Sequence, residues 1–493
     1  MSKIFCYVQA CDLIILGAKG DLSRRKLFPA LYNLEKKKIL HPNTKIISVG
    51  RANWSIKFYK NIVYKELKCF IKEKINKKLW KKFSSRLNFY NLDINETENF
   101  YKLKKKLNQK KRITISYCAI SSNNFLSIFN GLKKSKINNK SSRIILEKPI
   151  GNDFKSSKKI NKNLSKFFKE KQIYRIDHYL GKETIINLLT LRFANSLFIN
   201  NWNNQYIDYV QITVAENIGI EGRWEYFDKV GQMRDMIQSH LLQILTIITM
   251  SAPTSLTYNN IRDEKIKILR SLRKINYKNV DNKTVIGQYT SGYINGKKVP
   301  GYLEEKKSIK NSFTETFVSI KVNIDNWQWK GVPFYLRTGK RLPVKYSEIV
   351  IFFKDLSLNI FKDSCNILPK NKLIIRLDPN DKIDIEILNK NPKSYNIYAL
   401  KKRKININLK TKQFYKKNPK IDAYERLILE LMKGKKDLFV SNDEIEESWK
   451  WIDSIIIAWK LKNKRPSLYN AGTWGPKDSE VMINRDGKFW KNF

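Results

Sequence analysis

The chain has few acidic residues, few histidines and few cysteines for its length. Its 493 residues include 45 Asp and Glu, three His and five Cys. The cysteines form no Cys-x-x-Cys pair, so we expect neither a structural zinc site nor a disulfide framework, and a reducing cytoplasm fits best. No run of about 18 apolar residues occurs, which excludes a membrane-spanning helix. The short apolar run near the N-terminus leads straight into a glycine turn and predicts a first strand, not a signal peptide.

Basic residues, by contrast, are abundant. The 96 Lys and Arg exceed the acidic residues by enough to give a formal net charge of +51. A basic surface attracts polyanions, so nucleic-acid binding is one hypothesis. Most of the excess is lysine in short runs along the whole chain, whereas phosphate and base recognition relies on the arginine fork. We therefore favour a solvated, lysine-rich enzyme surface.

Length and hydrophobic content predict a folded protein of two or three domains, at roughly 150 residues per domain. In the first part, short apolar runs alternate with helical periodicity, including a helix expected over 56–77. Alternating strands and helices predict a parallel, doubly wound sheet, so we expect a Rossmann-like dinucleotide-binding domain over 1–180. The expected strands are 12–16, 45–49, 86–90, 113–118 and 143–146.

The pattern changes after residue 200. Residues 208–215 alternate apolar and polar side chains, a helix is expected over 229–250, and Asn295-Gly296 predicts a type I′ hairpin. We expect a large mixed, mainly antiparallel sheet with helices, in a β+α domain over 181–493. Its further expected strands are 316–324, 347–353, 373–378 and 382–388, and its late helices are 422–432 and 443–461.

The first expected strand ends in a glycine turn, Gly17-x-x-Gly20-Asp21-Leu22. Glycines let the backbone approach a pyrophosphate, and the following helix offers N–H donors and a positive dipole end. At the end of the second strand, Arg51 stands where NAD-binding proteins usually carry an acidic residue, so a 2′-phosphate and hence NADP are favoured, with Lys19 able to assist. The alternatives are a purely structural turn and a solvated Arg51.

Two of the three histidines lie in informative surroundings. His178 belongs to RIDHYLGKE, which combines a carboxylate, an imidazole, a phenol and an ammonium, as an anionic, hydroxyl-rich ligand requires. His240 lies on an apolar helical stretch, where a histidine is more often a core residue than a catalyst. Asp177 offers a carboxylate that could orient an imidazole for general-base catalysis.

Five motifs occur in order along the chain: GAKGDL (17–22), EKP (147–149), RIDHYLGKE (175–183), GQMRDMIQSHLL (231–242) and FYLRTGKR (334–341). Together they resemble the motifs of the glucose-6-phosphate dehydrogenase family. The resemblance extends from about Cys11 to Pro476. It implies oxidation of glucose 6-phosphate at C1 to 6-phosphogluconolactone, with NADP as cofactor, as the first step of the oxidative pentose phosphate pathway.

The resemblance also implies roles for individual residues. His240 is the general base, and Asp177 orients its imidazole. The residues expected at the sugar phosphate are His178, Tyr179, Lys182 and Lys345, and those at the sugar hydroxyls and the substrate's edge are Glu216, Asp235 and Lys340. Lys148 is expected where substrate and cofactor meet. The other expected cofactor-binding residues are Gly17, Ala18, Lys19, Gly20, Asp21, Leu22, Ser23, Arg24, Arg51, Leu92 and Asp93.

Some points lie outside this assignment. Ser121-Ser122 occupies a loop where relatives often have proline, and the lysine-dense stretch 400–420 has no assigned function. The family implies a homodimer or homotetramer, and we expect no metal, no membrane association and no specific nucleic acid. The alternatives are a related sugar dehydrogenase with another substrate, or a basic nucleic-acid-binding protein on a dehydrogenase scaffold.

Overall fold

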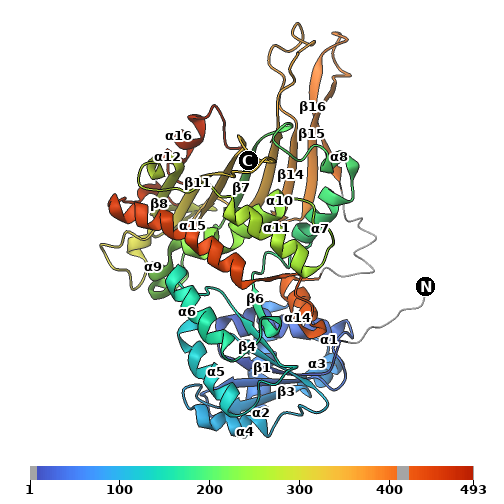
Figure 1. The fold of residues 1–493 in the computed structure, drawn as a ribbon, viewed down its shortest axis with the longest axis vertical. Helices are drawn as coiled ribbons and strands as arrows, with labels where there is room; N and C mark the ends of the chain where they lie inside the picture. The colour runs from blue at the N-terminus through green and yellow to red at the C-terminus, as the bar shows by residue number, and fades with distance from the viewer. Residues whose placement is uncertain (1–7, 408–420, 492–493) are drawn as a thin grey trace, which may run out of the picture. The chain divides into compact units, whose positions relative to one another are not determined.

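The computed structural model describes residues 8–407 and 421–491 (Figure 1). These residues form two compact units. The first unit comprises the described residues up to Gly181 together with 421–446, and the second comprises 182–407 and 447–491. Among the described residues, no helix combines the length and hydrophobicity that crossing a membrane requires.

The first unit is built on a seven-stranded sheet in the order β17-β6-β5-β4-β1-β2-β3. All neighbours are parallel except β17, which runs antiparallel to β6. The central strands are buried apolar runs, as a parallel sheet covered on both faces requires. The strands are β1 (Cys11–Leu16), β2 (Lys45–Gly50), β3 (Leu87–Asn91), β4 (Ile113–Cys118), β5 (Arg143–Leu146), β6 (Ile173–Ile176) and β17 (Phe439–Val440).

Helices connect these strands in two groups. Helix α1 contacts α2, α3 and α14, whereas α5 contacts α4 and α6. Because the strand order runs in opposite directions from β1, right-handed crossovers place the two groups on opposite faces. The helices are α1 (Phe28–Lys36), α2 (Ile56–Phe70), α3 (Lys77–Ser84), α4 (Phe100–Lys104), α5 (Phe125–Lys134), α6 (Phe154–Ser165) and α14 (Ala423–Lys433), with a π-helical turn η1 (Ser23–Leu27) and 3-10 turns η2 (Thr97–Asn99), η3 (Ser122–Asn124) and η4 (Glu170–Gln172).

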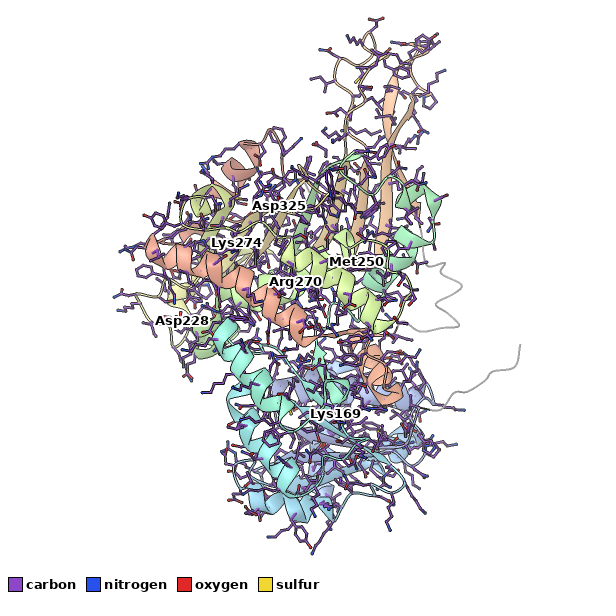
Figure 2. All side chains as sticks on the ribbon, viewed as in Figure 1. Lys169, Asp228, Met250, Arg270, Lys274 and Asp325 are labelled. Atoms are coloured by element: carbon purple, nitrogen blue, oxygen red, sulfur yellow. The ribbon has the colours of Figure 1, made fainter. Side chains whose placement is uncertain are left out.

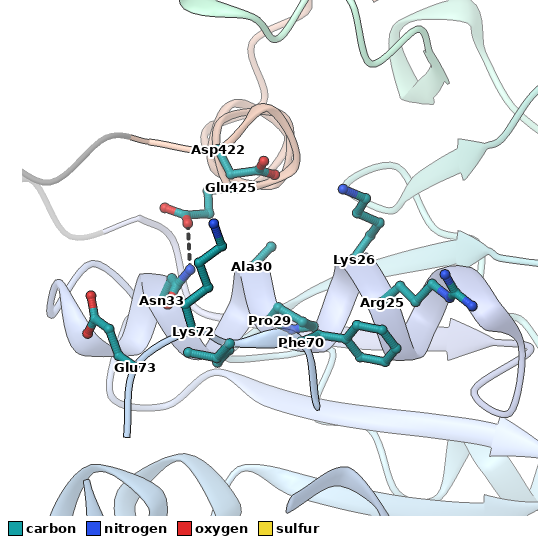
Figure 3. Close-up of a pocket in the computed structure, with 11 residues that line it drawn as sticks. Arg25, Lys26, Pro29, Ala30, Asn33, Phe70, Lys72, Glu73, Asp422 and Glu425 are labelled. Atoms are coloured by element: carbon teal, nitrogen blue, oxygen red, sulfur yellow. Dashed lines mark hydrogen bonds between the residues drawn. The ribbon is translucent and has the colours of Figure 1, made fainter. Parts of the chain in front are cut away.

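The C-terminal segment 421–446, which the sequence placed in the second domain, packs in the first unit. The Asn33 amide on α1 donates a hydrogen bond to the Glu425 carboxylate on α14 (2.8 Å; Figure 3). Lys37 forms an ion pair with the same carboxylate. Apolar residues of α14, such as Leu427 and Leu431, join the core formed by the central sheet and α1. The functional division of the chain at residue 180 stays a prediction.

The second unit is built on a nine-stranded sheet in the order β16-β15-β14-β13-β7-β12-β11-β8-β18. It is mainly antiparallel, with parallel pairs between β12 and β7 and between β18 and β8. The strands are β7 (Ile207–Ala215), β8 (Thr284–Thr290), β11 (Phe317–Asn323), β12 (Pro333–Gly339), β13 (Tyr346–Phe353), β14 (Lys372–Asp378), β15 (Lys382–Lys390), β16 (Leu400–Ile407) and β18 (Ser467–Asn470), besides the hairpin β9 (Gly292–Ile294) and β10 (Lys297–Val299).

Helices of the second unit cover this sheet, since α7 contacts β14 and the π-helical stretch η5 contacts β12. The helices are α7 (Glu183–Phe193), α8 (Ser196–Ile199), α9 (Trp224–Gln232), η5 (Met233–Leu241), α10 (Leu242–Thr249), α11 (Tyr258–Arg270), α12 (Val280–Lys283), α15 (Asn442–Leu461, which begins in the first unit) and α16 (Asp478–Asn484), with a 3-10 turn η6 (Tyr302–Glu304). The predicted fold class, a Rossmann-like domain followed by a large mixed sheet domain, is confirmed.

Two sequence predictions need correction. The helix expected over 56–77 ends at Phe70, because Ile71 is extended (ψ 124°), and a second helix, α3, starts after Asn76, whose side chain accepts the Leu79 N–H. The helix expected over 229–250 is broken at Gly231 (φ 70°, ψ 171°) and continues as η5 and α10. The Asn295-Gly296 turn is confirmed, with positive φ at both residues. Of the lysine-dense stretch, 400–407 forms β16, and 408–420 lies outside the described residues.

Candidate active site

The glycine turn after β1 leaves no room for a side chain at Gly17. Its φ is +96°, and a Cβ there would lie 2.5 Å from both the Ala119 carbonyl oxygen and the Ile120 side chain. The backbone N–H groups of Gly17 and Ala18 both donate to the Val49 carbonyl of β2 (3.2 Å each). The turn is therefore pressed between the ends of β2 and β4, at the carboxyl edge of the sheet where doubly wound folds bind ligands.

The helix that follows this turn begins at Asp21 and is π-helical from Ser23 to Leu27. The Ser23 hydroxyl donates to the Gly17 carbonyl (3.0 Å) and ties the first turn of η1 to the glycine turn. Arg24 lies 3.3 Å from the Glu66 carboxylate and 3.9 Å from that of Asp21. The hydrogen bond from the Arg24 N–H to the Gly20 carbonyl (3.3 Å) closes the first turn of this helix. The N–H groups that precede Arg24, at the positive end of the helix dipole, suit a phosphate.

At the end of β2, Arg51 is exposed and, among the described residues, forms no hydrogen bond or ion pair. Lys19 lies with its ammonium 5.3 Å from the Trp54 ring. Leu92 is buried and donates its N–H to the Gly50 carbonyl (3.0 Å), which places 92–93 beside the end of β2. The glycine turn, Arg51 and Leu92 therefore lie at one edge of the sheet, and an exposed arginine there suits a 2′-phosphate.

The loop after β4 carries the departure from the family pattern. Ser121 precedes η3, and its carbonyl accepts the Asn124 N–H (3.1 Å). The same loop supplies Ala119 and Ile120, which enclose Gly17. The serine pair therefore lies next to the glycine turn.

Glu147 is a functional candidate for which no role was predicted. Its carboxylate accepts a hydrogen bond from the buried Tyr117 hydroxyl. The residue is half-buried as a whole, but its carboxyl group is enclosed, and this burial raises the pKa of Glu147 to about 7, against the opposing effects of Tyr117 and Lys148. The EKP motif, in which Glu147 precedes Lys148, pointed to this position. The motif could not show that the carboxyl group is buried, because burial depends on the tertiary structure.

Asp177, His178 and Tyr179 form a compact cluster in the first unit. The buried Asp177 carboxylate accepts the Tyr179 N–H (2.9 Å). The His178 ring stacks on Tyr424 of α14, with 6.1 Å between centroids and 28° between planes. Helix α14 also contacts the end of the RIDHYLGKE motif, because the Arg426 guanidinium on α14 donates to the Gly181 carbonyl (3.0 Å). The local sequence of RIDHYLGKE gave no sign of this support from residues far along the chain.

His240 lies in the second unit on the π-helical stretch η5 and is 1% exposed. π-Helical segments are rare and are frequent at functional sites. The stretch also carries Asp235, whose carbonyl accepts the Ser239 hydroxyl (3.1 Å).

Two other predicted residues of this unit meet directly. The Lys340 ammonium donates to the Glu216 carboxylate (2.8 Å), and Lys340 is 1% exposed. Both follow the parallel strands β7 and β12, and the Glu216 N–H donates to the Gly339 carbonyl (3.0 Å). Parallel pairing therefore places this carboxylate and this cation at the same edge of the sheet.

Lys182 and Lys345 are brought together by the end of β14. The Lys182 ammonium lies 3.5 Å from the Leu377 carbonyl oxygen, and Lys345 pairs with the carboxylate of the next residue, Asp378 (2.8 Å). Lys345 remains 65% exposed, so it stays accessible to a ligand. Lys182 is also the N-cap of α7, and two cations beside a helix N-terminus match the needs of a phosphate dianion.

Two further features of the described residues were compared with the predicted site: possible metal-binding groups and the hollow in Figure 3. Within the described part of the chain, no group of three or more His, Cys, Asp and Glu residues could hold a metal ion. The hollow, of about 270 Å³, lies in the first unit and contains no predicted site residue. The residues lining it are Arg25, Lys26, Pro29, Ala30, Asn33, Phe70, Ile71, Lys72, Glu73, Asp422 and Glu425.

Comparisons with known proteins match both units. Residues 14–187 match the family model described as the NAD binding domain of glucose-6-phosphate dehydrogenase, and 189–491 match its C-terminal domain. The chain is 57% identical to glucose-6-phosphate 1-dehydrogenase of Buchnera aphidicola subsp. Schizaphis graminum over 98% of this chain and 99% of the relative. It is 56% identical to that of Dickeya dadantii over 98% of each.

A solved structure described as glucose-6-phosphate dehydrogenase in complex with its substrate glucose-6-phosphate superposes with a TM-score of 0.88. It is 32% identical and covers 99% of both chains. The resemblance and the enzyme class that the sequence predicted are thereby confirmed. The chain belongs to the glucose-6-phosphate dehydrogenase family.

Proposed function

We propose that the chain oxidises D-glucose 6-phosphate at C1 to 6-phospho-D-glucono-1,5-lactone, with NADP as the hydride acceptor. The observation that carries this is the match of both domains, over nearly the whole chain, to glucose-6-phosphate dehydrogenases. The reaction is the first step of the oxidative pentose phosphate pathway in this family.

The substrate's phosphate is bound by Lys182 and Lys345. Their ammonium groups are held on neighbouring residues, Leu377 and Asp378, so a dianion can bridge them. His178 and Tyr179 are the proposed further contacts, from the cluster stacked on α14. Glu216, Asp235 and Lys340 are proposed to bind sugar hydroxyls, since carboxylates accept hydrogen bonds from hydroxyl donors.

The proton of the C1 hydroxyl is taken by the His240 imidazole. A buried imidazole on a helix is excluded from bulk water and has a fixed direction, which favours proton transfer in one geometry. The partnership of His240 with Asp177 remains a family-based proposal. Replacing Asp177 with Asn tests it, because a partner of the imidazole affects kcat and the pH dependence of kcat more than the KM for substrate.

The glycine turn fits NADP. Glycine at position 17 lets the turn pack against the Ala119 carbonyl, which a Cβ would meet. The helix N-terminus that follows the turn offers N–H groups for the pyrophosphate. The exposed Arg51 guanidinium, with Lys19 nearby in the turn, is the proposed contact for the 2′-phosphate, and Leu92, Asp93 and Lys148 complete the set. Bound in this way, NADP supplies the acceptor for the C1 hydride.

We further propose a homodimer or homotetramer located in the cytoplasm, as family membership suggests, with no specific nucleic-acid partner. A steady-state assay tests the reaction, with glucose 6-phosphate or glucose as substrate and NADP or NAD as acceptor. Turnover of glucose 6-phosphate with NADP supports the proposal. Equal turnover of unphosphorylated glucose favours a related sugar dehydrogenase instead.

A further inference from the structure

The helix that carries His240 is held at both ends by buried side chains. After the break at Gly231, η5 and α10 form one continuous helical segment from Met233 to Thr249. Met250 follows its last residue and is labelled in Figure 2. The anchors at the two ends come from elements distant in sequence.

The C-terminal end is satisfied by three buried side chains. A helix normally leaves its last carbonyls without partners. Here the Met250 N–H bonds to the Thr246 carbonyl (2.8 Å), and each of the next carbonyls accepts a side-chain donor. The donors are Arg192 to Ile247 and to Met250 (2.6 Å each), Trp202 to Ile248 (2.7 Å) and Trp329 to Thr249 (2.7 Å).

The N-terminal end is closed by Glu315. Its carboxylate accepts the Met233 N–H (3.0 Å), and its backbone carbonyl accepts the Gln232 N–H (3.0 Å). The Gln232 amide in turn donates to the Thr338 hydroxyl of β12 (2.8 Å). A Cβ at Gly231 would lie 2.4 Å from the Glu315 carboxylate, so glycine permits this close approach.

The charges at the two ends have the signs that the helix dipole favours. A carboxylate lies at the positive N-terminal end, and the Arg192 guanidinium lies at the negative C-terminal end. Arg192 is 1% exposed and lies 4.5 Å from the Phe193 ring and 5.2 Å from the Trp202 ring. Burial lowers the pKa of Arg192 to about 9, so it remains protonated at neutral pH.

Arg192 also connects two parts of the proposed site. It lies near the end of α7, whose N-cap is Lys182, and α7 contacts α10. One helix therefore carries a phosphate-binding lysine at its start and anchors the His240 helix at its end. Helix α7 therefore links the lysine proposed to bind phosphate with the helix that carries the proposed general base.

We propose that Arg192 and Glu315 are positioning residues that fix the helical register of η5 and thereby the direction of the His240 imidazole. The inference rests on the proposed function of His240. Shifting an α-helix by one residue turns a side chain by about 100°, so a segment that relaxes from π to α geometry redirects the imidazole. Neither positioning residue needs to touch the substrate.

The test uses the full-length chain and the variants Arg192→Met, Arg192→Lys and Glu315→Gln. A misdirected base slows the chemical step, so we expect Arg192→Met to lower kcat about 10²-fold with little change in the KM for glucose 6-phosphate. The deuterium isotope effect on kcat, with substrate deuterated at C1, rises. Arg192→Lys keeps the charge and recovers part of kcat, and Glu315→Gln keeps an acceptor and loses less.

Arg337→Lys is the matched control. Arg337 is a buried guanidinium of the same unit, lying over the rings of Trp474 (5.0 Å) and Trp490 (4.0 Å). We expect this variant to lower the Tm but to leave the isotope effect and kcat per folded molecule unchanged.

The outcomes separate the two proposals. If the wild type fails to oxidise glucose 6-phosphate, the proposed function falls and the positioning role falls with it. If the wild type is active but the folded fractions of Arg192→Lys and Glu315→Gln show wild-type kcat and isotope effects, the function stands and the positioning role is overturned. These two conservative variants decide the question if Arg192→Met does not fold.

Discussion

The two π-helical stretches of the described chain, η1 and η5, both follow a glycine in the left-handed region, yet they are used in opposite ways. Gly17 and Gly231 each exclude a Cβ, the first against the Ala119 carbonyl and the second against the Glu315 carboxylate. In the first unit, within the described part of the chain, no side chain caps the N-terminus of the helix that contains η1, and the N–H groups there suit a phosphate. In the second unit a protein carboxylate fills the same position.

This difference shows how one local geometry serves two tasks. A helix N-terminus presents a partial positive charge that some anion will neutralise. When the anion is a ligand, the helix end becomes a binding site, and when it is a side chain, the helix becomes a rigid support. The stretch that carries His240, the proposed general base, is the one held at its ends by protein side chains, as a base with a fixed direction requires.

The largest expected effect concerns the residue that the rigid stretch carries. We expect His240→Asn to lower kcat by about 10²–10⁴-fold, because the base that takes the C1 hydroxyl proton is lost. The KM for NADP changes little, because His240 is not among the proposed cofactor contacts. Steady-state kinetics at saturating NADP measure this, and full activity of the variant contradicts the assigned role.

Each unit contains a buried carboxyl group, Glu147 in the first and Glu315 in the second. The next expected effect is the dependence of stability on pH that Glu147 causes. Its pKa is raised by burial from 4.5 to about 7, so the folded state binds this proton more tightly than the unfolded state. The resulting stabilisation is complete below about pH 4.5 and is lost as the pH rises through 7, by at most about 3 kcal/mol. Glu147→Gln removes this dependence.

Thermal unfolding of both proteins between pH 5 and 8 measures the effect. We expect the Tm of the wild type to fall relative to that of Glu147→Gln as the pH rises. Parallel Tm curves would show that Glu147 titrates normally. Glu315, which is also buried and whose pKa is also raised, contributes a pH dependence of the same sign.

The glycines themselves provide the most direct pair of substitutions. Alanine at either position meets a close contact and an unfavourable φ, at a cost of about 1–3 kcal/mol. We expect Gly17→Ala to raise the KM for NADP while leaving most of kcat at saturation. Gly231→Ala should lower kcat and leave the KM for NADP unchanged.

The reverse pattern would contradict the separation of a ligand-binding turn from a supporting turn. Gly222→Ala is a suitable control, because its φ is also positive (+76°) but a Cβ there meets no atom within 4 Å among the described residues. It isolates the backbone contribution from the steric one.

The most local of these effects is expected at Arg51, where a single ligand contact is lost. Loss of a charged hydrogen-bond donor to the 2′-phosphate costs about 1.5–3 kcal/mol, so Arg51→Ala should raise the KM for NADP by roughly tenfold to a hundredfold. The KM for NAD, which lacks that phosphate, should stay nearly constant. Equal changes for both cofactors would mean that Arg51 does not read the 2′-phosphate.

Local patterns predicted much of the fold. The strands at 113–118 and 143–146 were predicted with the bounds that β4 and β5 have, because buried runs between turns are readable without tertiary information. The turn at Asn295-Gly296 was predicted because positive φ at two successive residues demands those residue types. Family motifs supplied the candidate site, and the structure brings Glu216 to Lys340 and Lys182 to the end of β14, near Lys345.

What local patterns missed depends on distant residues. Glu315 and Arg192 bond to the two ends of the helical segment around His240 and are both far away in sequence, so the periodicity of 229–250 could not reveal these contacts. Segment 421–446 belongs to the first unit through Glu425 and the two-residue strand β17, which is too short to leave a pattern. The start of α3 did carry a signal, the Asn76 cap, which a continuing helical periodicity concealed.

The central claim is that this chain oxidises a phosphorylated sugar with NADP through a base held on the rigid helix. The most direct measurement is the initial rate of NADPH formation with glucose 6-phosphate, compared with glucose at the same concentration. We predict rapid NADPH formation with glucose 6-phosphate and a far lower rate with glucose, because Lys182 and Lys345 then have no phosphate to bind. No NADPH formation with glucose 6-phosphate, or equal rates with both sugars, would contradict the account.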